Sequence, residues 1–389
     1  MGALDGLRVI DAGVLVQAPQ AAALFAQFGA DVIKVEFPGA GDHSRWLPVR
    51  IGDTRSAYFA GNNRGKRSIT VNLNAAVGRE VFLRLVAAAD VLLTNFGPGR
   101  LEAWGLGPDV LAACNPRLVH GAGSAYGALG PDAHYEGADL GGQARGGLIS
   151  TTGVDGGEPT PVGATVADHI ASQHLAAGVL AALLARERTG RGQRVEVSLL
   201  GGQVWAQAAE ITAFLMTGAQ PGRANHGHPL VAGIYGIFPT SDGWIAVIGV
   251  TPPHKQRFFD ALGRPDLFER FGATALLPHD DKAALFAELS TAFRQRRRAE
   301  WAAVLDGLGL RSAPVQAYAE VAADPQVWAN DYLVETGDGP VVGTPVRFSE
   351  TPAAVGGPAP ELGQHTEEVL LEHGYTWEDI AVLRDGGAI

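Results

Sequence analysis

Asp168 is the side chain best placed to do chemistry in this sequence. It stands in the first turn of a helical pattern over residues 165–188, behind the glycine- and proline-rich segment GVDGGEPTPVGA. A carboxylate can attack a strongly electrophilic acyl group, such as a thioester, in a site that removes solvent, so Asp168 could act as a covalent nucleophile. Backbone N–H groups of the segment GGLISTTG, residues 146–153, could then stabilise the oxyanion.

The same position also has a purely structural explanation. With Thr165 as N-cap, Thr165 and Asp168 form a T-x-x-D variant of the capping box, and the helix dipole favours an acidic residue there. The residues alone leave both roles open, and the two roles can coexist.

A run of basic residues is the second chemical feature. Asp53 is the only acid between positions 45 and 67, and the bases are Arg45, Arg50, Arg55, Arg64, Lys66 and Arg67. The formal net charge of the chain is −11, which argues against general nucleic-acid binding because phosphate neutralisation needs an excess of lysine and arginine. A local basic patch fits a small polyanionic ligand, and the alternative is a solvated surface.

These residues must be positioned by strands and helices that alternate along the first third of the chain. We expect strands at residues 7–11, 31–36, 90–95 and 117–123, separated by helical patterns such as APQAAALFAQFGA. Parallel strands joined by helical crossovers predict a doubly wound α/β fold. Asn95 and Ser124 lie at or just beyond the ends of two of these strands, where ligands bind in open α/β sheets.

The motifs of several common enzyme classes are missing. Neither G-x-G-x-x-G nor a Walker A loop occurs at the expected places, and Ser124 in GAGSAYG does not fit G-x-S-x-G. No H-E-x-x-H occurs, and His226 and His228 on a glycine-rich turn favour a polar loop over a metal site. Cys114 is the only cysteine, which excludes an internal disulfide and thiolate-rich metal sites. We therefore expect no metal site.

Length and composition allow more than one domain. The chain has 389 residues, of which 46% are apolar and 18% charged. The segment TGAQPGRANHGH, residues 217–228, is typical of a linker, and two strand-like segments and several helical patterns follow it to about residue 310. No uninterrupted apolar segment approaches the ~20 residues that cross a bilayer, and no signal-peptide pattern opens the chain. We expect an unprocessed cytoplasmic protein that binds no membrane.

Taken in order, these segments resemble the family III CoA-transferases, the group of formyl-CoA and carnitine-CoA transferases. The resemblance spans nearly the whole chain and is carried by LVQAPQAAALFAQFGADVIKVEFPGAGD, NNRGKRSITVNL, TNFGPGRLEAWGLG, GADLGGQARGGLISTTG, GEPTPVGATVADHIASQHLAAGVLAALLARERTGRGQRVEVSL and PAPELGQHTEEVLLEHGY. It implies a large Rossmann-like CoA-binding domain over residues 1–215 with 325–389 and a small α+β domain over residues 225–320. Linkers would span 216–224 and 321–324, and two subunits would form an interlocked homodimer.

The resemblance also implies a reaction and a site. An aspartate, here Asp168, attacks the thioester of an acyl-CoA donor, and an anhydride and then an aspartyl-CoA thioester carry CoA to a carboxylic acid. Coenzyme A is a substrate, and no further cofactor is expected. Arginine and lysine from the basic run would hold its phosphates. The residues expected to contact CoA or the acyl group are Gln17, Ala18, Arg45, Lys66, Val71, Asn72, Leu73, Asn74, Asn95, Phe96, Gly97, Arg100, Ala138 and Asp139.

Some positions depart from the family pattern. Pro38 and Ala103 stand where some members carry arginines that face the nucleotide, so Arg100 or Arg45 would have to supply those contacts. The small domain lacks the glycine run of some formyl-CoA transferases, which argues against oxalate or formate as substrate.

Two other functions remain as alternatives. One is an α-methylacyl-CoA racemase, which needs two bases at the α-carbon. Its histidine would fall on Ala138, which carries no proton, and His134 is the nearest substitute. The other is a CoA-binding protein without turnover, in which Asp168 would serve only as a cap.

Overall fold

The computed structural model describes residues 1–231, 233–272 and 279–389, which pack as two units. The larger unit comprises Met1–Gly146, Ala164–Ala206 and Pro325–Ile389, and the smaller unit comprises Gly147–Gly163 and Gln207–Asp324. Segments 147–163 and 207–215, which we expected in the large domain, therefore pack with the smaller unit. Residues 232 and 273–278 of the small domain expected over 225–320 lie outside the described residues.

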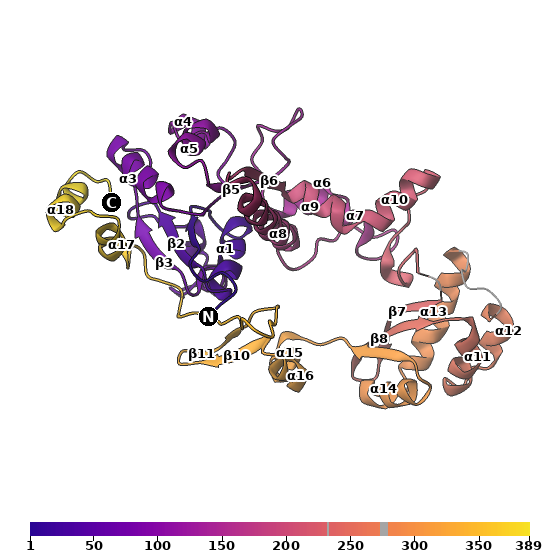
Figure 1. Cartoon of the computed structure of the whole chain (residues 1–389). Coiled ribbons are helices and arrows are strands. Elements are labelled where there is room, and N and C mark those ends of the chain that lie inside the picture. Colours follow the sequence, from indigo (N-terminus) through magenta and orange to yellow (C-terminus); the bar gives the residue numbers. More distant parts are fainter. Residues whose placement is uncertain (232, 273–278) are drawn as a thin grey trace. The chain divides into compact units, whose positions relative to one another are not determined.

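A parallel six-stranded sheet forms the centre of the larger unit (Figure 1). Its strand order is β3-β2-β1-β4-β5-β6, and neighbouring strands all run parallel. The strands are β1 (Arg8–Asp11), β2 (Asp31–Glu36), β3 (Arg67–Thr70), β4 (Val91–Thr94), β5 (Val119–Ser124) and β6 (Arg194–Ser198). The expected doubly wound α/β fold is confirmed. The chain changes its winding direction between β1 and β4, so a ligand crevice is expected at their carboxyl ends.

The strand residues alternate between two apolar layers, as the period of two in a strand requires. Val9, Val32 and Val91 pack towards α1 (Gln17–Gln27) and α8 (Val166–Thr189). The neighbouring residues Ile10, Ile33 and Leu92 pack in the opposite core. That core is completed by α3 (Ala76–Ala87), α5 (Pro108–Cys114), α17 (Thr366–Glu372) and α18 (Trp377–Asp385). A Cβ at Gly121 of β5 would lie 2.7 Å from Leu93 and 2.9 Å from Val179, so glycine lets α8 approach the sheet closely.

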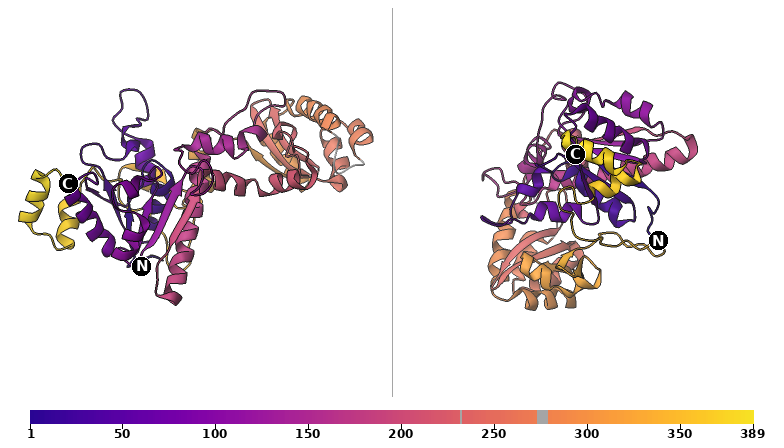
Figure 2. Two further views of the ribbon diagram at one scale, coloured as in Figure 1. Left: turned by 90° about the horizontal axis from the view of Figure 1, so that it is seen from above. Right: turned by 90° about the vertical axis from the view of Figure 1, so that its left-hand side faces the viewer.

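Both ends of the chain contribute to the larger unit. Figure 2 shows the yellow C-terminal helices beside the indigo and violet N-terminal part. The N–H of His365 donates to the carbonyl of Ser68 at 2.8 Å, and the N–H of Ser68 donates to the His365 ring at 3.1 Å. Other elements of this unit are η1 (His43–Trp46), α2 (Ala57–Asn63), α4 (Arg100–Ala103), α6 (Asp139–Arg145), α9 (Leu199–Ala206), α16 (Pro325–Ala329) and the hairpin of β10 (Leu333–Thr336) and β11 (Gly339–Val342).

The smaller unit is built around an antiparallel sheet of β7 (Ile234–Thr240), β8 (Gly243–Val250) and β9 (Arg311–Pro314). Its core contains Phe238, Phe258, Phe293 and Trp301, with the Phe238 and Phe293 rings stacked at 5.0 Å between centroids. The other elements are α7 (Leu148–Thr151), α10 (Ala208–Thr217), η2 (Ala224–His226), α11 (Pro252–Ala261), α12 (Asp266–Phe271), α13 (His279–Phe293), α14 (Arg298–Gly307) and α15 (Tyr318–Ala323).

Candidate active site

A cleft of about 580 Å³ lies at the carboxyl edge of the parallel sheet. Its walls come from segments that follow β1, β2, β3, β4 and β5 and from the first turn of α8. This is the crevice that the winding switch between β1 and β4 predicts, and its volume is usual for a small-molecule site.

The loop between β1 and α1 forms one wall and is held by two neighbouring segments. Asn95 Oδ1 accepts from the N–H of Val14 at 2.8 Å, and Asn95 Nδ2 donates to the Val14 carbonyl at 2.9 Å. Leu15 has a φ of +64°, which is rare for a bulky side chain, and its N–H donates to Asp42 Oδ1 at 3.0 Å. Asn95 therefore both lines the cleft and fixes the shape of its wall.

Four buried charged residues support this loop from the interior, and we call them the buried ion cluster: Asp11, Lys34, Asp42 and Lys66. Lys66 Nζ lies 2.7 Å from Asp11, and Lys34 Nζ lies 2.9 Å from Asp42 and 3.6 Å from Asp11. Lys34 also donates to the carbonyl of Gly13 at 2.9 Å. The cluster thus connects the strands β1 and β2 to the cleft wall.

The cluster keeps opposite charges together. Burial alone would lower the pKa of Lys34, but Asp11, Asp42 and Glu36 together raise it. Burial alone would raise the pKa of Asp42, but Lys34 and the N–H groups of Leu15 and Ser44 lower it. For Lys66, burial lowers the pKa to about 8 although Asp11 opposes the change.

Asp168 lies in the first turn of α8, and its side chain lines the cleft. Thr165 is the N-cap but makes no side-chain capping bond, and its hydroxyl instead lies 3.2 Å from the His169 ring. The T-x-x-D capping box that the sequence allowed is therefore not formed. Within the part of the chain that the structure describes, the Asp168 carboxylate has no hydrogen-bond or ion-pair partner.

The electrostatic surroundings of Asp168 favour its protonated form. Burial raises the pKa of Asp168 to about 7, and the nearby negative charge of Asp139 adds to the rise. A carboxyl group with this pKa is about half ionised at neutral pH. Perturbed groups of this kind are typical of functional sites in clefts.

The structure brings most of the predicted site residues together. Besides Asp168, the cleft is lined by Gln17, Val71, Leu73, Asn74, Asn95, Phe96, Gly97, Arg100 and Ala138. Gln17 is 3% exposed, and its amide donates to the carbonyl of Ser124 at 3.2 Å. Contact of these residues with CoA or an acyl group stays a prediction.

Other predicted residues do not line the cleft: Ala18, Arg45, Lys66, Asn72 and Asp139. Ala18 is fully buried in the core beside the sheet, and Asn72 Nδ2 donates to the carbonyl of Gly387 at 2.9 Å. Asp139 accepts backbone N–H groups at the start of α8 instead of facing the cleft.

The predicted basic patch needs a partial correction, because acids from other parts of the chain pair with three of its members, Arg45, Lys66 and Arg67. Arg45 Nε lies 2.7 Å from Glu36 Oε2, and Lys66 is 3% exposed inside the buried ion cluster. Arg67 lies 2.7 Å from Asp31 and 2.8 Å from Glu372. Arg45 and Lys66 are therefore occupied by structural contacts and do not fit the role of phosphate ligands.

The cleft also contains residues that the sequence analysis did not single out: Leu15, His43, Trp104, Tyr135, Glu136 and Leu199. The Trp104 ring meets Phe96 edge-on at 5.2 Å, its Nε1 donates to Asn74 Oδ1 at 2.9 Å, and the Arg100 guanidinium lies 5.6 Å from it. Arg100 has no carboxylate partner among the described residues, so it is a free cation on this wall. The tryptophan in the segment TNFGPGRLEAWG, Trp104, was the sequence signal from which this wall could have been predicted.

Two further expectations can be compared with the structure. His134, the substitute base for a racemase, is exposed and is not a lining residue of the cleft; its ring lies tilted against that of Tyr135, with 4.1 Å between ring centroids. All of the segment GGLISTTG except Gly146 belongs to the smaller unit, where Leu148–Thr151 forms α7 rather than a glycine loop.

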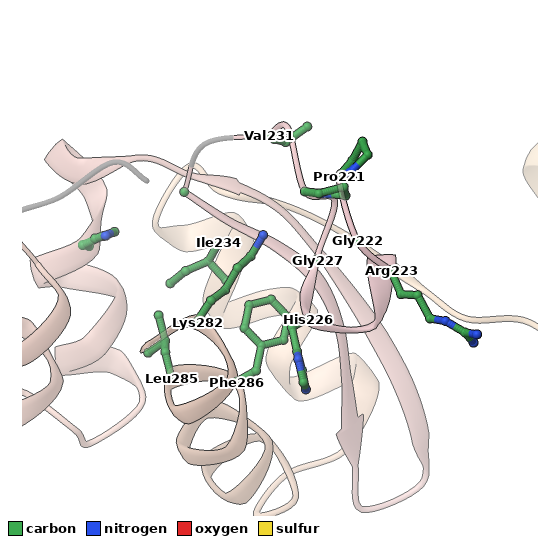
Figure 3. Close-up of a pocket in the computed structure, with 13 residues that line it drawn as sticks. Pro221, Gly222, Arg223, His226, Gly227, Val231, Ile234, Lys282, Leu285 and Phe286 are labelled. Atoms are coloured by element: carbon green, nitrogen blue, oxygen red, sulfur yellow. The ribbon is translucent and has the colours of Figure 1, made fainter. Parts of the chain in front are cut away.

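A second cleft, of about 160 Å³, lies in the smaller unit (Figure 3). Lys282 and Phe286 of α13 face the segment around Gly227 there. None of the predicted site residues lines this cleft, so the larger cleft is the candidate active site. No helix of the described ranges is long and apolar enough to cross a membrane. Among the same residues, no group of three His, Cys, Asp or Glu side chains is arranged to hold a metal ion.

Comparison with known proteins agrees with this geometry. CoA-transferase family III matches residues 4–366. The chain is 34% identical to a succinyl-CoA:mesaconate CoA-transferase of Haloarcula marismortui, over 96% of this chain and 97% of the relative. It is 35% identical to an acetyl-CoA:oxalate CoA-transferase of Acetobacter aceti, over 90% of each. The crystal structure of a CAIB/BAIF family protein from Brucella suis superposes with a TM-score of 0.86 at 32% identity, covering 96% of this chain and 99% of that one. The chain therefore belongs to the family III CoA-transferases, enzymes that transfer CoA between an acyl-CoA and a carboxylic acid.

Proposed function

We propose that this enzyme transfers CoA through covalent intermediates on Asp168. The observation that carries the proposal is the Asp168 carboxylate itself, which faces the cleft and has no partner among the described residues. Gln17 and Asn95 line the same cleft. A carboxylate held in a partly desolvated site can attack a thioester, whose carbonyl is strongly electrophilic.

The reaction balances without an added cofactor. Asp168 adds to the donor thioester carbonyl, the C–S bond breaks, and CoA thiolate leaves a mixed anhydride. The thiolate then attacks the Asp168 carbonyl, which gives an aspartyl-CoA thioester and releases the donor carboxylate. An acceptor carboxylate attacks this thioester to form a second anhydride and free thiolate. Attack of the thiolate on the acceptor carbonyl yields the new acyl-CoA and restores Asp168.

The pKa of Asp168 gives this mechanism a pH dependence. Only the ionised carboxylate is a nucleophile, and the pKa of Asp168 lies at about 7 because of burial and the nearby Asp139. We therefore expect kcat to rise with pH through about 7 and to fall below it, as measured with buffers of constant ionic strength. A profile that is flat between pH 5 and 8 would contradict nucleophilic attack by a group of this pKa.

Substitution of Asp168 tests the proposal directly. Asp168→Ala should lower the transfer rate by at least about 10³-fold, because removal of a nucleophile abolishes the covalent route, while CoA binding by calorimetry stays near that of the wild type. Asp132→Ala is a matched control, since Asp132 pairs with Arg145 at 2.7 Å and does not line the cleft. Circular dichroism and thermal unfolding confirm that both variants fold.

Trapping identifies the intermediate and separates the alternatives. Wild-type enzyme incubated with acyl-CoA and hydroxylamine or borohydride should lose activity, and peptide mass spectrometry should place the modification at Asp168. A racemase would instead exchange the α-proton of a 2-methylacyl-CoA in D₂O without transferring CoA. Modification elsewhere, or exchange without transfer, refutes the assignment of Asp168 as nucleophile.

The acids themselves require a screen. The named relatives act on succinyl-CoA and mesaconate or on acetyl-CoA and oxalate, so a panel should pair short dicarboxylates and monocarboxylates with their CoA esters. Three residues that line the same cleft, Gln17, Ala138 and Leu199, are uncharged, which supports an uncharged part of the acyl group there. Measurement of kcat/KM across the panel ranks the donors and acceptors.

We also propose that the enzyme works as a homodimer, as the family resemblance implies. Apolar side chains that a second copy could cover support this: α10 contains no buried residue, and Leu215 and Met216 on it are 76% and 80% exposed. One chain has a mass of 40.6 kDa, and light scattering coupled to gel filtration should give twice this value. A single-chain mass at micromolar concentration would contradict the proposal.

A further inference from the structure

The start of α8 is capped by a residue that is distant in sequence. Asp139 Oδ1 accepts from the N–H of Ala167 at 2.7 Å and from the N–H of Asp168 at 3.2 Å. These two N–H groups belong to the first turn, where a helix has no internal acceptors for them. Thr165, the local N-cap, does not use its side chain for this purpose. Asp139, at the start of α6, therefore supplies the capping carboxylate.

Asp139 is itself firmly oriented. Its Oδ2 accepts from Gln143 Nε2 at 2.6 Å, and Gln143 is 1% exposed. The same amide donates to the carbonyl of Ala164 at 3.3 Å, just before α8. A Cβ at Gly142 would lie 2.9 Å from the Ala167 Cβ, so glycine allows α6 to lie directly against the first turn of α8. The position of the Asp139 carboxylate is thus fixed by packing and by a buried amide.

This arrangement has a consequence for the neighbouring carboxylate. An aspartate in the first turn of a helix ordinarily accepts free N–H groups and is stabilised in its charged form. Here Asp139 occupies the N–H groups of Ala167 and Asp168, so these donors are not available to the Asp168 side chain. The Asp168 carboxylate is left facing the cleft.

We propose that Asp139 is a positioning residue for the transfer reaction, which occupies the N–H groups at the start of α8 and so keeps the Asp168 carboxylate unbonded and directed into the cleft. The inference rests on the proposed role of Asp168 as nucleophile. A carboxylate that accepts no hydrogen bond from the helix keeps its lone pairs for attack on the thioester, and it is a stronger nucleophile than a capped one. The adjacent negative charge of Asp139 acts in the same direction.

Few other charged groups act on Asp168. From α8, the ring of His169 points to Gln20 Oε1 at 2.6 Å, and burial lowers its pKa although Asp139 opposes the change. The segments α1 and α9 contribute the uncharged Gln17 and Leu199 to the cleft. The remaining ionisable residues of the cleft are Glu36, Asp42, His43, Arg100, Tyr135 and Glu136. Besides burial, the negative charge of Asp139 raises the pKa of Asp168.

Asp139→Asn tests the contribution of the Asp139 charge, because its side-chain oxygen can still accept from the helix while the negative charge is gone. The pH of half-maximal kcat should fall by about one unit, because removal of a nearby like charge lowers the pKa of Asp168. The dissociation constant of CoA should stay within twofold. Asp132→Asn removes a charge from the same segment outside the cleft and should leave the pH profile unchanged. A pH profile identical to the wild type in Asp139→Asn would contradict the contribution of the Asp139 charge to the pKa of Asp168.

A second pair of measurements separates positioning from stability. Asp139→Ala frees both N–H groups, so kcat should fall by about 10- to 100-fold with little change in KM, as expected for a misplaced reacting group. Gln143→Leu keeps both carboxylates and removes the bond that orients Asp139, so kcat should fall without a downward shift of the pH profile. If both variants fold and retain wild-type kcat, the positioning role is excluded.

A readout that is independent of turnover keeps the two proposals distinguishable. In protein labelled with ¹³C at aspartate Cγ, the Asp168 signal is assigned by its loss in Asp168→Asn and is titrated in the wild type and in Asp139→Asn. Failure of the proposed function shows as transfer activity in Asp168→Ala. Failure of this inference shows as an Asp168 titration that does not change when Asp139 is replaced.

Discussion

Two groups of buried carboxylates in the larger unit differ in the direction in which their pKa values shift. In the buried ion cluster, Asp11 and Asp42 lie within 3.6 Å of lysine ammonium groups, and the pKa of Asp42 is lowered by Lys34 and by backbone N–H groups although burial opposes the change. At the start of α8, Asp168 and Asp139 are neighbours without a cation, and the pKa of Asp168 is raised to about 7. The first group stabilises a wall of the cleft, and the second holds a reactive carboxylate. Burial is common to both, so the sign of the neighbouring charge decides the function.

Removal of a cation from the buried ion cluster should give the largest effect on stability. Lys66→Met leaves the Pro19 carbonyl and Asn63 without their donor and removes the ammonium group 2.7 Å from Asp11. Loss of one partner of a buried pair typically costs about 3–5 kcal/mol of the free energy of unfolding. Chemical denaturation measures this loss. Arg55→Met, at an exposed pair with Asp53, is the control and should leave the midpoint of unfolding unchanged.

Neutralisation of Asp168 should instead increase the free energy of unfolding. The folded state raises the pKa of Asp168 from 3.8 to about 7, so folded protein binds an additional proton between these values and loses stability as the pH rises through this range. Above pH 7 the folded protein bears the full cost in stability of holding an ionised Asp168 in a buried site. Asp168→Asn removes it and should stabilise the protein at pH 8 by about 1–3 kcal/mol, less than the full shift implies because the cleft admits water.

Stability measured across pH tests whether the gain from Asp168→Asn comes from the raised pKa of Asp168. The gain from Asp168→Asn should disappear at pH 4, where the wild-type carboxyl is protonated in the folded state, whereas Asp132→Asn should give no gain at either pH. Thermal unfolding at both pH values measures these differences. Destabilisation by Asp168→Asn at pH 8 would show that the carboxylate is held by favourable contacts, contrary to the comparison.

Periodic patterns made much of the larger unit predictable. Alternating β-branched segments and helical patterns gave β1, β2, β4 and β5 and the doubly wound arrangement, and hence the edge where Asn95 and Ser124 lie. The strand β3 was not recognised, because its four residues, RSIT, directly follow the basic run and carry only one large apolar side chain. The two compact units also differ from the expected domain boundaries at helices 148–151 and 208–217, since these helices have no local signal that assigns them to one unit.

Charge pairing was the part of the site that the sequence could not reveal. Arg45 and Lys66 looked free because Asp53 is the only acid within residues 45–67, whereas their partners Glu36 and Asp11 stand at the ends of β2 and β1. The capping residue of α8 could not be predicted for the same reason, since Asp139 lies 29 residues before Asp168. Long-range pairing of this kind depends on strand register and helix packing, which local patterns do not specify.

The smallest effect concerns Arg100. Arg100 lines the cleft beside Trp104 and has no carboxylate partner among the described residues, so we expect it to contact a CoA phosphate. Arg100→Ala should weaken CoA binding by about tenfold, close to 1.4 kcal/mol, and reduce the salt dependence of binding because one charge contact is lost. Arg55→Ala, in a pair with Asp53 away from the cleft, is the matched control and should bind CoA like the wild type.

Dephospho-CoA tells which phosphate Arg100 contacts. If Arg100 binds the 3′-phosphate, the loss from Arg100→Ala and the loss from removing that phosphate are not additive, because both eliminate the same contact. Additive losses of binding free energy would indicate that Arg100 contacts the diphosphate instead. Unchanged affinity in Arg100→Ala for both ligands would mean that phosphate recognition comes from residues outside this cleft, and the contrast between neutralised and free cations would then lose its functional meaning.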